Sequence, residues 1–539
     1  MFVFDISKAT MASATQTEEH VQLKLLINEE SNKVVFAEAG KDFVDILCSF
    51  LTIPLGTIAR LSQKDSNMGP VTVGCLNSLY QSVSNLDECL WTTTSKELLL
   101  CPRNSSEDYC STLKINIDDL VPTEYFMYGN KYCRSYHDHY ISGNEDYCST
   151  LKINIDDLVP AEDFMYGNKY CRSDDDHYFS GNGLILSTSA NDKCPCCNGC
   201  CNRSIFLKPY CKGFVNSVAT FVITEDLTIR PNSMVHTSFS LLQNSGITTS
   251  SAKEITVNVT QEKVLDILKC ALVSKSPMTD VFLGKKPSIA RHLFFPCNFD
   301  NSSDIQFMLQ LVIRKSDGNI LFAHGEKDFA DLLLSFLTFP LGGVIHKLGR
   351  YSFRGWIGRG YSSVSCIGRL YKSIYELDVN KYLVSKEAKE RLVDPCMDSE
   401  FKSSKNVLPI KKPRDHFYCY YQGENYDQSI INDQFFITDE YRSDDKKCVT
   451  MNLVKALKNS ATDEGYVKGP RTYLVTDDLV ISPSSPISAQ LLINRLQIPL
   501  EDLKEKVVII GMNECLSILN AALISTSALT NGLLHIIQS

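Results

Sequence analysis

The cysteine run KCPCCNGCC is the part of the sequence whose residue types and spacing point most directly to chemistry. Cys194 and Cys197 form one CxxC pair, and Cys197 and Cys200 form another. Thiolates at this spacing can both reach one tetrahedral zinc ion, because a tight turn between them brings the sulfurs together. Cys171, or alternatively Cys133, stands in the context KYC and would complete the ligands. The sequence therefore predicts a structural zinc site, with a reduced cysteine-rich surface loop as the alternative.

The second half of the chain supports zinc less clearly. Cys419 and Cys448 remain there, but Val449, Thr450 and Met451 stand where the rest of the cluster would be. Redox chemistry of the thioredoxin type would need a CxxC at the start of a helix that follows a strand. The Gly and Asn residues within the run do not favour such a helix start.

A second candidate is the basic and aromatic segment 347–369, which contains GWIGRGYSS. Arg354 and Arg359 with the glycine amides could hold a phosphate, and Trp356 could stack on a base. The matching stretch of the first half, SQKDSNMGP, has one basic residue and no aromatic residue. We therefore interpret 347–369 as a connecting loop, with anion or nucleic-acid contact as the alternative. The formal charge of −9 also argues against a general nucleic-acid binder.

Local motifs for catalysis are missing from the sequence. None of GxSxG, HExxH, GxGxxG or the phosphate-binding GxxxxGK[ST] occurs. Isolated Ser, His and Asp residues are plentiful, but no motif organises them. An enzyme hypothesis therefore has no anchor residue in the sequence.

The elements that must position any site occur twice. KDFVDILCSFLTIPLG at 41–56 matches KDFADLLLSFLTFPLG at 327–342 with a constant offset of 286 residues. Before each copy, apolar residues alternate with polar ones in two runs, which predicts a β-hairpin. The apolar spacing within each copy predicts a helix that ends near Pro54 or Pro340, since proline lacks an amide proton. We expect Phe43 and Phe50, like their counterparts in the second half, to pack this helix on the hairpin.

Further matches give both halves the same order of parts. A helix is predicted at 74–87 and at 365–378, and strand-to-helix segments match at 255–274 and 507–525. FVITEDLTIRPNS likewise matches YLVTDDLVISPSS. The sequence therefore predicts an α+β protein with two homologous halves from internal duplication, each holding a ββαα unit and a βαβα unit around a cysteine-bearing insertion. The predicted parts are a flexible tail at 1–19, ββαα units at 20–100 and 304–390, insertions at 101–217 and 391–468, and βαβα units at 218–296 and 469–539.

The first insertion contains a tandem repeat of its own. Residues 107–144 recur almost unchanged at 145–182. Matched cysteines are 93 residues apart in the first half and 52 in the second, so removing one 38-residue copy nearly equalises them. One copy is therefore an addition, which we expect to loop out on the surface unless it is a gene-model artefact.

The composition indicates a globular protein inside the cell. No stretch of about 18 apolar residues could span a membrane, and the start MFVFDISKAT lacks the pattern of a secretory signal. The 21 cysteines are an odd number, which favours reduced thiols over a disulfide framework. We therefore expect a cytoplasmic or nuclear protein.

The motifs carry a resemblance to a known family. KDFVDxLxSFLTxPLG, the GCLxxLYxSVxxLD helix, the PRNSS-EDYC-xLKINIDD stretch and the TDDLxIxP strand resemble the plant-specific family called domain of unknown function 674. The resemblance covers the chain from about residue 20 to its end. It implies a plant protein with this two-half build, and it carries no activity, substrate or catalytic residue.

These observations favour a non-catalytic interaction or regulatory module that binds a protein partner. Their support is a fold-building pattern throughout the chain and no catalytic constellation. The alternative is an enzyme whose site assembles in a cleft between the halves. A deep pocket lined by ionisable residues would favour the enzyme, and exposed apolar patches would favour the module.

Overall fold

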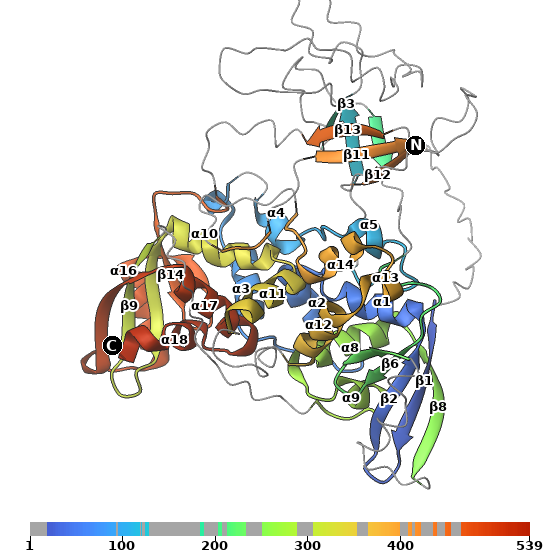
Figure 1. Ribbon diagram of the computed structural model, residues 1–539. Coiled ribbons are helices and arrows are strands. Elements are labelled where there is room, and N and C mark those ends of the chain that lie inside the picture. The colour runs from blue at the N-terminus through green and yellow to red at the C-terminus, as the bar shows by residue number, and fades with distance from the viewer. Residues whose placement is uncertain are drawn as a thin grey trace, which may run out of the picture.

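The fold combines helices with two antiparallel sheets of five strands each, so it is mixed α+β. The computed structural model describes residues 19–92, 95–118, 120, 124–128, 184–187, 203–206, 213–232, 251–287, 306–352, 365–398, 408–411, 416–421, 435–438, 448–453 and 465–538. The two sheets lie at opposite ends of the helical layer that separates them (Figure 1).

The first sheet is built entirely from the first half of the chain, and all its neighbouring strands are antiparallel. In spatial order its strands are β7 (Ile229–Pro231), β6 (Phe221–Thr224), β2 (Lys33–Ala39), β1 (Val21–Asn28) and β8 (Ala252–Val259). The alternating apolar side chains of β1 point into the core, as their period of two predicts.

The second sheet has the corresponding strands of the second half in the same order. These are β15 (Ile481–Pro483), β14 (Thr472–Thr476), β10 (Ile320–Glu326), β9 (Phe307–Arg314) and β16 (Leu503–Ile510). The expected division of each half into a ββαα unit and a βαβα unit is wrong in one respect. The strands of both expected units join one sheet, because β6 pairs with β2 and β8 pairs with β1. FVITEDLTIRP also forms the hairpin β6–β7 rather than a strand leading into a helix.

Most of the helices lie between the two sheets and contact one another there, whereas α16 (Pro486–Leu496) lies on the outer face of the second sheet (Figure 1). Those of the first half are α1 (Lys41–Ser49), α2 (Leu55–Ser62), α3 (Leu76–Asn85), η1 (Glu88–Leu90), α4 (Ser95–Leu100), α5 (Glu107–Cys110), α8 (Gln261–Val273) and α9 (Pro277–Phe282). Those of the second half are α10 (Lys327–Ser335), η5 (Phe336–Thr338), α11 (Leu341–Ser352), α12 (Ser365–Glu376), α13 (Val379–Tyr382), α14 (Lys386–Val393), α16 (Pro486–Leu496), η6 (Leu500–Asp502), α17 (Met512–Ile524), α18 (Ala528–Gly532) and α19 (Leu534–Gln538).

The matched KDF segments form core helices, as the sequence predicts. Helix α1 ends before Pro54, and α10 with the short η5 ends before Pro340. Phe43 and Phe50 are almost completely buried, and so are Phe329 and Phe336 in the second half. The match between these segments therefore reflects packing in the core.

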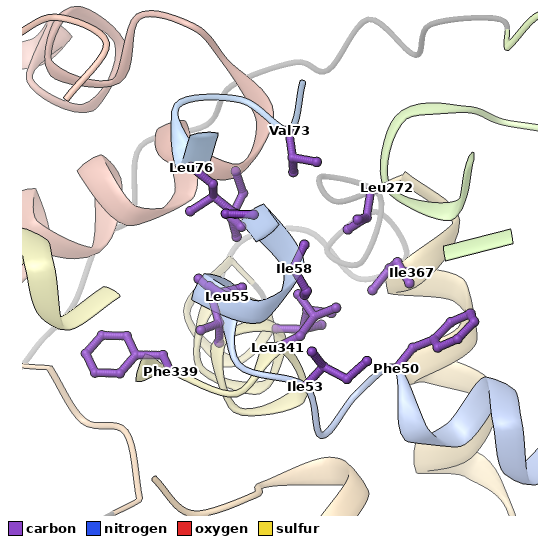
Figure 2. Packing of buried hydrophobic residues seen from close by; sticks show 14 of the residues in the cluster. Phe50, Ile53, Leu55, Ile58, Val73, Leu76, Leu272, Phe339, Leu341 and Ile367 are labelled. Atoms are coloured by element: carbon purple, nitrogen blue, oxygen red, sulfur yellow. The ribbon is translucent and has the colours of Figure 1, made fainter. Parts of the chain in front are cut away.

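The two matched segments also meet each other at the centre of the molecule. The amide of Leu55 donates to the carbonyl of Phe339 at 3.0 Å, and the amide of Leu341 donates to the carbonyl of Ile53 at 3.0 Å. These residues are equivalent under the offset of 286, so the chain crosses itself at matched positions. Figure 2 shows Ile53, Leu55, Phe339 and Leu341 within one cluster of apolar side chains.

Helices α3 and α12 are exchanged between the halves. Cys75, which precedes α3, donates to the carbonyl of Ser525 in the second half at 3.0 Å, and Cys366 in α12 donates to that of Ser274 in the first half at 3.2 Å. Ser82 of α3 accepts from the amide of Ile481 at 3.0 Å, and Ser373 accepts from that of Ile229 at 3.0 Å. Each sheet is therefore packed by a helix from the other half, and the described apolar core is continuous across both halves.

Strands from the two insertions form a third sheet, placed above the helices in Figure 1. Its spatial order is β12 (Phe435–Thr438), β11 (His416–Tyr421), β13 (Cys448–Leu453), β4 (Leu184–Ser187), β3 (Glu124–Tyr128) and β5 (Arg203–Phe206). Strands β13 and β4 pair in parallel and join the contributions of the two halves.

The start of the first 38-residue copy belongs to the core. Tyr109 in α5 is buried and stacks on Phe214 with ring centroids 5.2 Å apart. The guanidinium of Arg391, from the second half, lies 5.5 Å from the centre of the Tyr109 ring. The second copy, 145–182, falls outside the described residues, so its expected surface position stays a prediction.

Candidate interaction surface

The predicted zinc ligands fall outside the described residues, in the first insertion. This applies to Cys133, Cys171, Cys194, Cys197 and Cys200. Among the residues that the structure does describe, no group of three or more His, Cys, Asp or Glu side chains is arranged to hold a metal ion. The zinc site therefore stays a prediction from sequence.

The basic and aromatic segment 347–369 is helical at both described ends: a loop was expected at its start, whereas the helix at its end agrees with the helix predicted at 365–378. Helix α11 continues to Ser352 and α12 begins at Ser365, whereas Arg354, Trp356 and Arg359 fall outside the described residues. Lys347 forms an ion pair with Asp394 at 3.4 Å. Arg369 pairs with Asp226. These two cations therefore already have carboxylate partners within the chain.

The described cysteines behave as core residues, since most are buried. Burial raises the pKa of Cys75, Cys110 and Cys270 to about 12. A thiol with so high a pKa carries almost no thiolate near neutral pH, and thiolate is the reactive form. None of these three thiols therefore suits nucleophilic or redox chemistry.

Two buried carboxylates tie the core helices to the segments that lead back from the insertions. Asp45 in α1 forms an ion pair with Lys41 and accepts from the amides of Phe214 and Val215, both at 2.8 Å. Asp331 in α10 pairs with Lys327 at 2.8 Å and accepts from the amide of Val467 at 2.9 Å. Burial raises the pKa of both aspartates, and the lysine and amide partners offset part of that effect. We assign these carboxylates a structural role, because their oxygens are occupied by the chain itself.

An apolar patch lies on the outer face of the second sheet, the face that points away from the helical core. Met308 on β9 and Val507 and Ile509 on β16 are 63%, 65% and 62% exposed. Ile509 lies directly opposite Met308 in the antiparallel pair, and Val507 is two residues further along the same face. We call these three residues the outer patch. Helix α16 covers the neighbouring part of the face, where Val312, Phe322 and Leu474 are buried beneath it.

The equivalent face of the first sheet is polar. Gln22 replaces Met308, Thr256 replaces Val507 and Asn258 replaces Ile509, and Gln22 lies opposite Asn258 in the same way. All three polar residues are exposed. The halves therefore share their strand order but differ in chemistry at this place.

The outer patch borders a free sheet edge. Among the described strands, β16 is the last of its sheet and pairs with β9 alone. The amide of Lys315 donates to the carbonyl of Asp502, the residue opposite it, so these two residues form a hydrogen-bonded pair. Hydrogen-bonded and non-hydrogen-bonded pairs alternate along two antiparallel strands. By that alternation the backbone groups of Glu505, Val507 and Ile509 point away from β9, and no described residue provides them with a backbone partner.

The charges beside the edge also differ between the halves. On the first sheet Glu254 lies 3.8 Å from Lys24 and forms an ion pair. The corresponding Glu505 accepts a hydrogen bond from the neutral amide of Gln310 at 2.9 Å, and within the described residues it has no ion pair. Among the described residues, the carboxylate of Glu505 therefore lies at the rim of the outer patch without the ion pair that Glu254 forms in the first half.

A Ser–His contact lies on the same face. Ser484, just before α16, is 2.8 Å from Nδ1 of His324 on β10. Burial lowers the pKa of His324, which favours the neutral imidazole, and Glu505 opposes the shift. No carboxylate among the described residues hydrogen-bonds to the ring to orient it, as nucleophilic catalysis would require. We assign the contact a structural role, since it connects the start of α16 to β10.

The outer patch was not predicted from the sequence. The signal was present, because matched strands carry Thr and Asn in one half and Val and Ile in the other. Recognising it required knowing which side of β16 faces outward. The β16 run VVII also resembles a buried strand, and its alternate residues Val508 and Ile510 are in fact buried.

Fold and surface together define an α+β protein of two interlocked halves with one polar and one apolar outer face. The chain belongs to the family described as protein of unknown function (DUF674), whose profile matches residues 17–143 and 139–513. The two matched stretches meet near the junction of the 38-residue copies. No curated protein and no solved structure matches the chain. None of the described helices is long and apolar enough to cross a membrane.

Proposed function

We propose that this protein is a non-catalytic interaction module that binds a protein partner through the outer patch of its second half. The observation that carries the proposal is the difference between equivalent faces, which are polar in the first half and apolar in the second. Burying each of the three exposed side chains is worth about 2 kcal/mol. A rimmed apolar surface of this kind is typical of binding sites.

The proposal includes an origin of the two halves by internal duplication. Equal strand orders and the paired inter-half hydrogen bonds support this origin. In a duplicated chain, both copies keep the residues that build the core, and only one copy needs to keep or gain a binding face. The proposal also places the protein in the cytoplasm or nucleus, supported by the cysteine usage.

Structural zinc in the first insertion is part of the proposal and is supported by sequence alone. Cys194, Cys197 and Cys200 would hold the metal with Cys171 or Cys133, and tetrahedral thiolate coordination would tie the insertion together. We expect about one zinc per chain in metal analysis of the purified, reduced protein. Cys194→Ser with Cys197→Ser should remove it, and a metal content near zero in the unmodified protein would contradict the site.

Site-specific photo-crosslinking tests the interaction surface. A benzophenone amino acid placed at Val507 should give a discrete adduct in extracts of cells that make the protein. The matched control places it at Thr256, the equivalent exposed position of the first half, where we expect no such adduct. Changing Ile509 to Asn should also reduce the adduct formed from position 507. Equal adducts from both positions, or none from position 507, would refute the proposed surface.

A further inference from the structure

Two residues of the outer patch, Val507 and Ile509, also lie on the free edge of β16. A partner could therefore contact their side chains and their backbone groups together. Glu505, Val507 and Ile509 have backbone groups that point outward along the edge and side chains that lie on the outer face. A ligand that added itself as a strand would use both features at once. Its backbone would satisfy the ladder, and its alternate side chains would cover the apolar face.

Edges of this kind are normally protected by charge in proteins that leave them free. The first half follows this rule, because its edge strand β8 presents Glu254 in an ion pair together with Thr256 and Asn258. The second half keeps charges at the start of β16, at Lys504, Glu505 and Lys506, but departs from the rule further along the strand, where the exposed Val507 and Ile509 stand at the positions that match Thr256 and Asn258. The departure falls on the one long edge strand of the second sheet, since the other edge strand, β15, has three residues.

Glu505 specifies the charge of the strand that fits. Its carboxylate forms no ion pair within the described residues, so a basic residue opposite it would gain one. A second copy of this chain would not supply a basic residue opposite Glu505, because the β16 residues whose backbone groups point outward are Leu503, Glu505, Val507 and Ile509. Pairing β16 with itself, with Val507 opposite Val507, would place each Glu505 opposite an Ile509, where a charge meets an apolar side chain. Centring the pair on Glu505 would instead oppose two like charges.

Resting on the function proposed above, we infer that the partner supplies an extended segment that adds to β16 as an antiparallel sixth strand, with a basic residue opposite Glu505 and apolar residues opposite Val507 and Ile509. The second sheet would then continue into the partner. Backbone hydrogen bonds would supply affinity, and the three side-chain positions would supply specificity.

The probe is a capped peptide that contains the sequence Ile-Thr-Val-Thr-Arg. In antiparallel register its isoleucine, valine and arginine lie opposite Ile509, Val507 and Glu505. A fluorescent version should bind the full-length protein, measured by anisotropy. Hydrogen exchange should slow at the amides of these three β16 residues, because their outward groups become bonded, while the amides of β8 stay unchanged.

Methylated peptides separate strand addition from general apolar contact. N-methylation of the valine, whose amide would point at β16, should weaken binding at least about tenfold by removing a backbone bond and adding a clash. N-methylation of the neighbouring threonine, whose amide points away, should leave binding unchanged. Exchanging the arginine for glutamate should also weaken binding at least about tenfold through repulsion by Glu505.

A double variant introduces the polar first-half residues at the matching positions of the second half. Val507→Thr with Ile509→Asn should abolish binding and keep the fold, because both side chains are exposed. Equal effects of the two methylations, or protection outside β16, would overturn strand addition. No binding up to about 1 mM, a free energy of roughly 4 kcal/mol, would also overturn it. A concentration-dependent dimer that the double variant abolishes would place a second copy on the edge and likewise contradict the inference.

Failure of the peptide to bind would not by itself contradict the proposed function, because the two claims are tested by separate experiments. Photo-crosslinking from position 507 does not depend on how the partner binds. An adduct at position 507 without strand addition by the peptide would leave the surface in place and remove only the binding mode.

Discussion

Replacing Asp45 by alanine is expected to lower the free energy of unfolding by about 3–5 kcal/mol, the usual cost of removing one partner from a buried ion pair. The Asp45 carboxylate is almost completely buried and accepts from the amides of Phe214 and Val215. Alanine would deprive both amides of their acceptor and Lys41 of its counter-charge. Each buried amide left without an acceptor costs about 1–3 kcal/mol.

The same helix provides the control for this substitution. Asp42 is about half exposed and lies 3.9 Å from Lys114, so Asp42→Ala should cost less than about 1 kcal/mol. Urea unfolding followed by circular dichroism measures both variants. Asp331→Ala should match Asp45→Ala, because Asp331 has the same role in the second half. If Asp45→Ala were as mild as Asp42→Ala, the tie between α1 and the 213–215 segment would be refuted.

The second large effect is expected at the crossing of the two halves, where Gly342→Ala should cost more than about 2 kcal/mol. The Gly342 amide donates to the Leu51 carbonyl at 2.6 Å. A Cβ atom at this position would fall within 3.0 Å of the backbone oxygens of Leu392 and Leu51. Backbone atoms cannot rotate away as the end of a side chain can, so the segments would have to separate.

The next residue is the matched control. A Cβ atom at Gly343 would have its nearest neighbour, the carbonyl oxygen of Pro395, at 3.3 Å. Alanine also favours a helix over glycine by about 1 kcal/mol, so Gly343→Ala should be close to neutral. Equal costs for the two substitutions would show that the crossing is not close-packed.

Sequence patterns predicted the local elements well, because apolar periodicity and proline act over a few residues. The β1–β2 hairpin, helix α1 and its end before Pro54 follow from such patterns. The joining of all five strands into one sheet did not, since β1 pairs with β8 more than 200 residues away. No local pattern records a pairing at that distance.

The exchange of α3 and α12 between the halves could not be predicted from the sequence either. An amphipathic helix has the same apolar stripe whichever half it packs on, and contacts such as those of Ser82 and Ser373 are needed to show which half that is. The outer patch required the same information. Val507 differs from Thr256 in the sequence, but only the register of β16 shows that both residues face outward.

The central claim is that the two halves share one core and fold as one unit, with a polar outer face on the first sheet and an apolar outer face on the second. Native-state hydrogen exchange of Gly342→Ala, compared with the unmodified protein, tests it most directly, because exchange reports local stability along the chain. We predict faster exchange in β1 and β2 of the first half as well as in β9 and β10 of the second. Faster exchange confined to 306–538, with 19–287 unchanged, would show that the halves are independent and would contradict the claim.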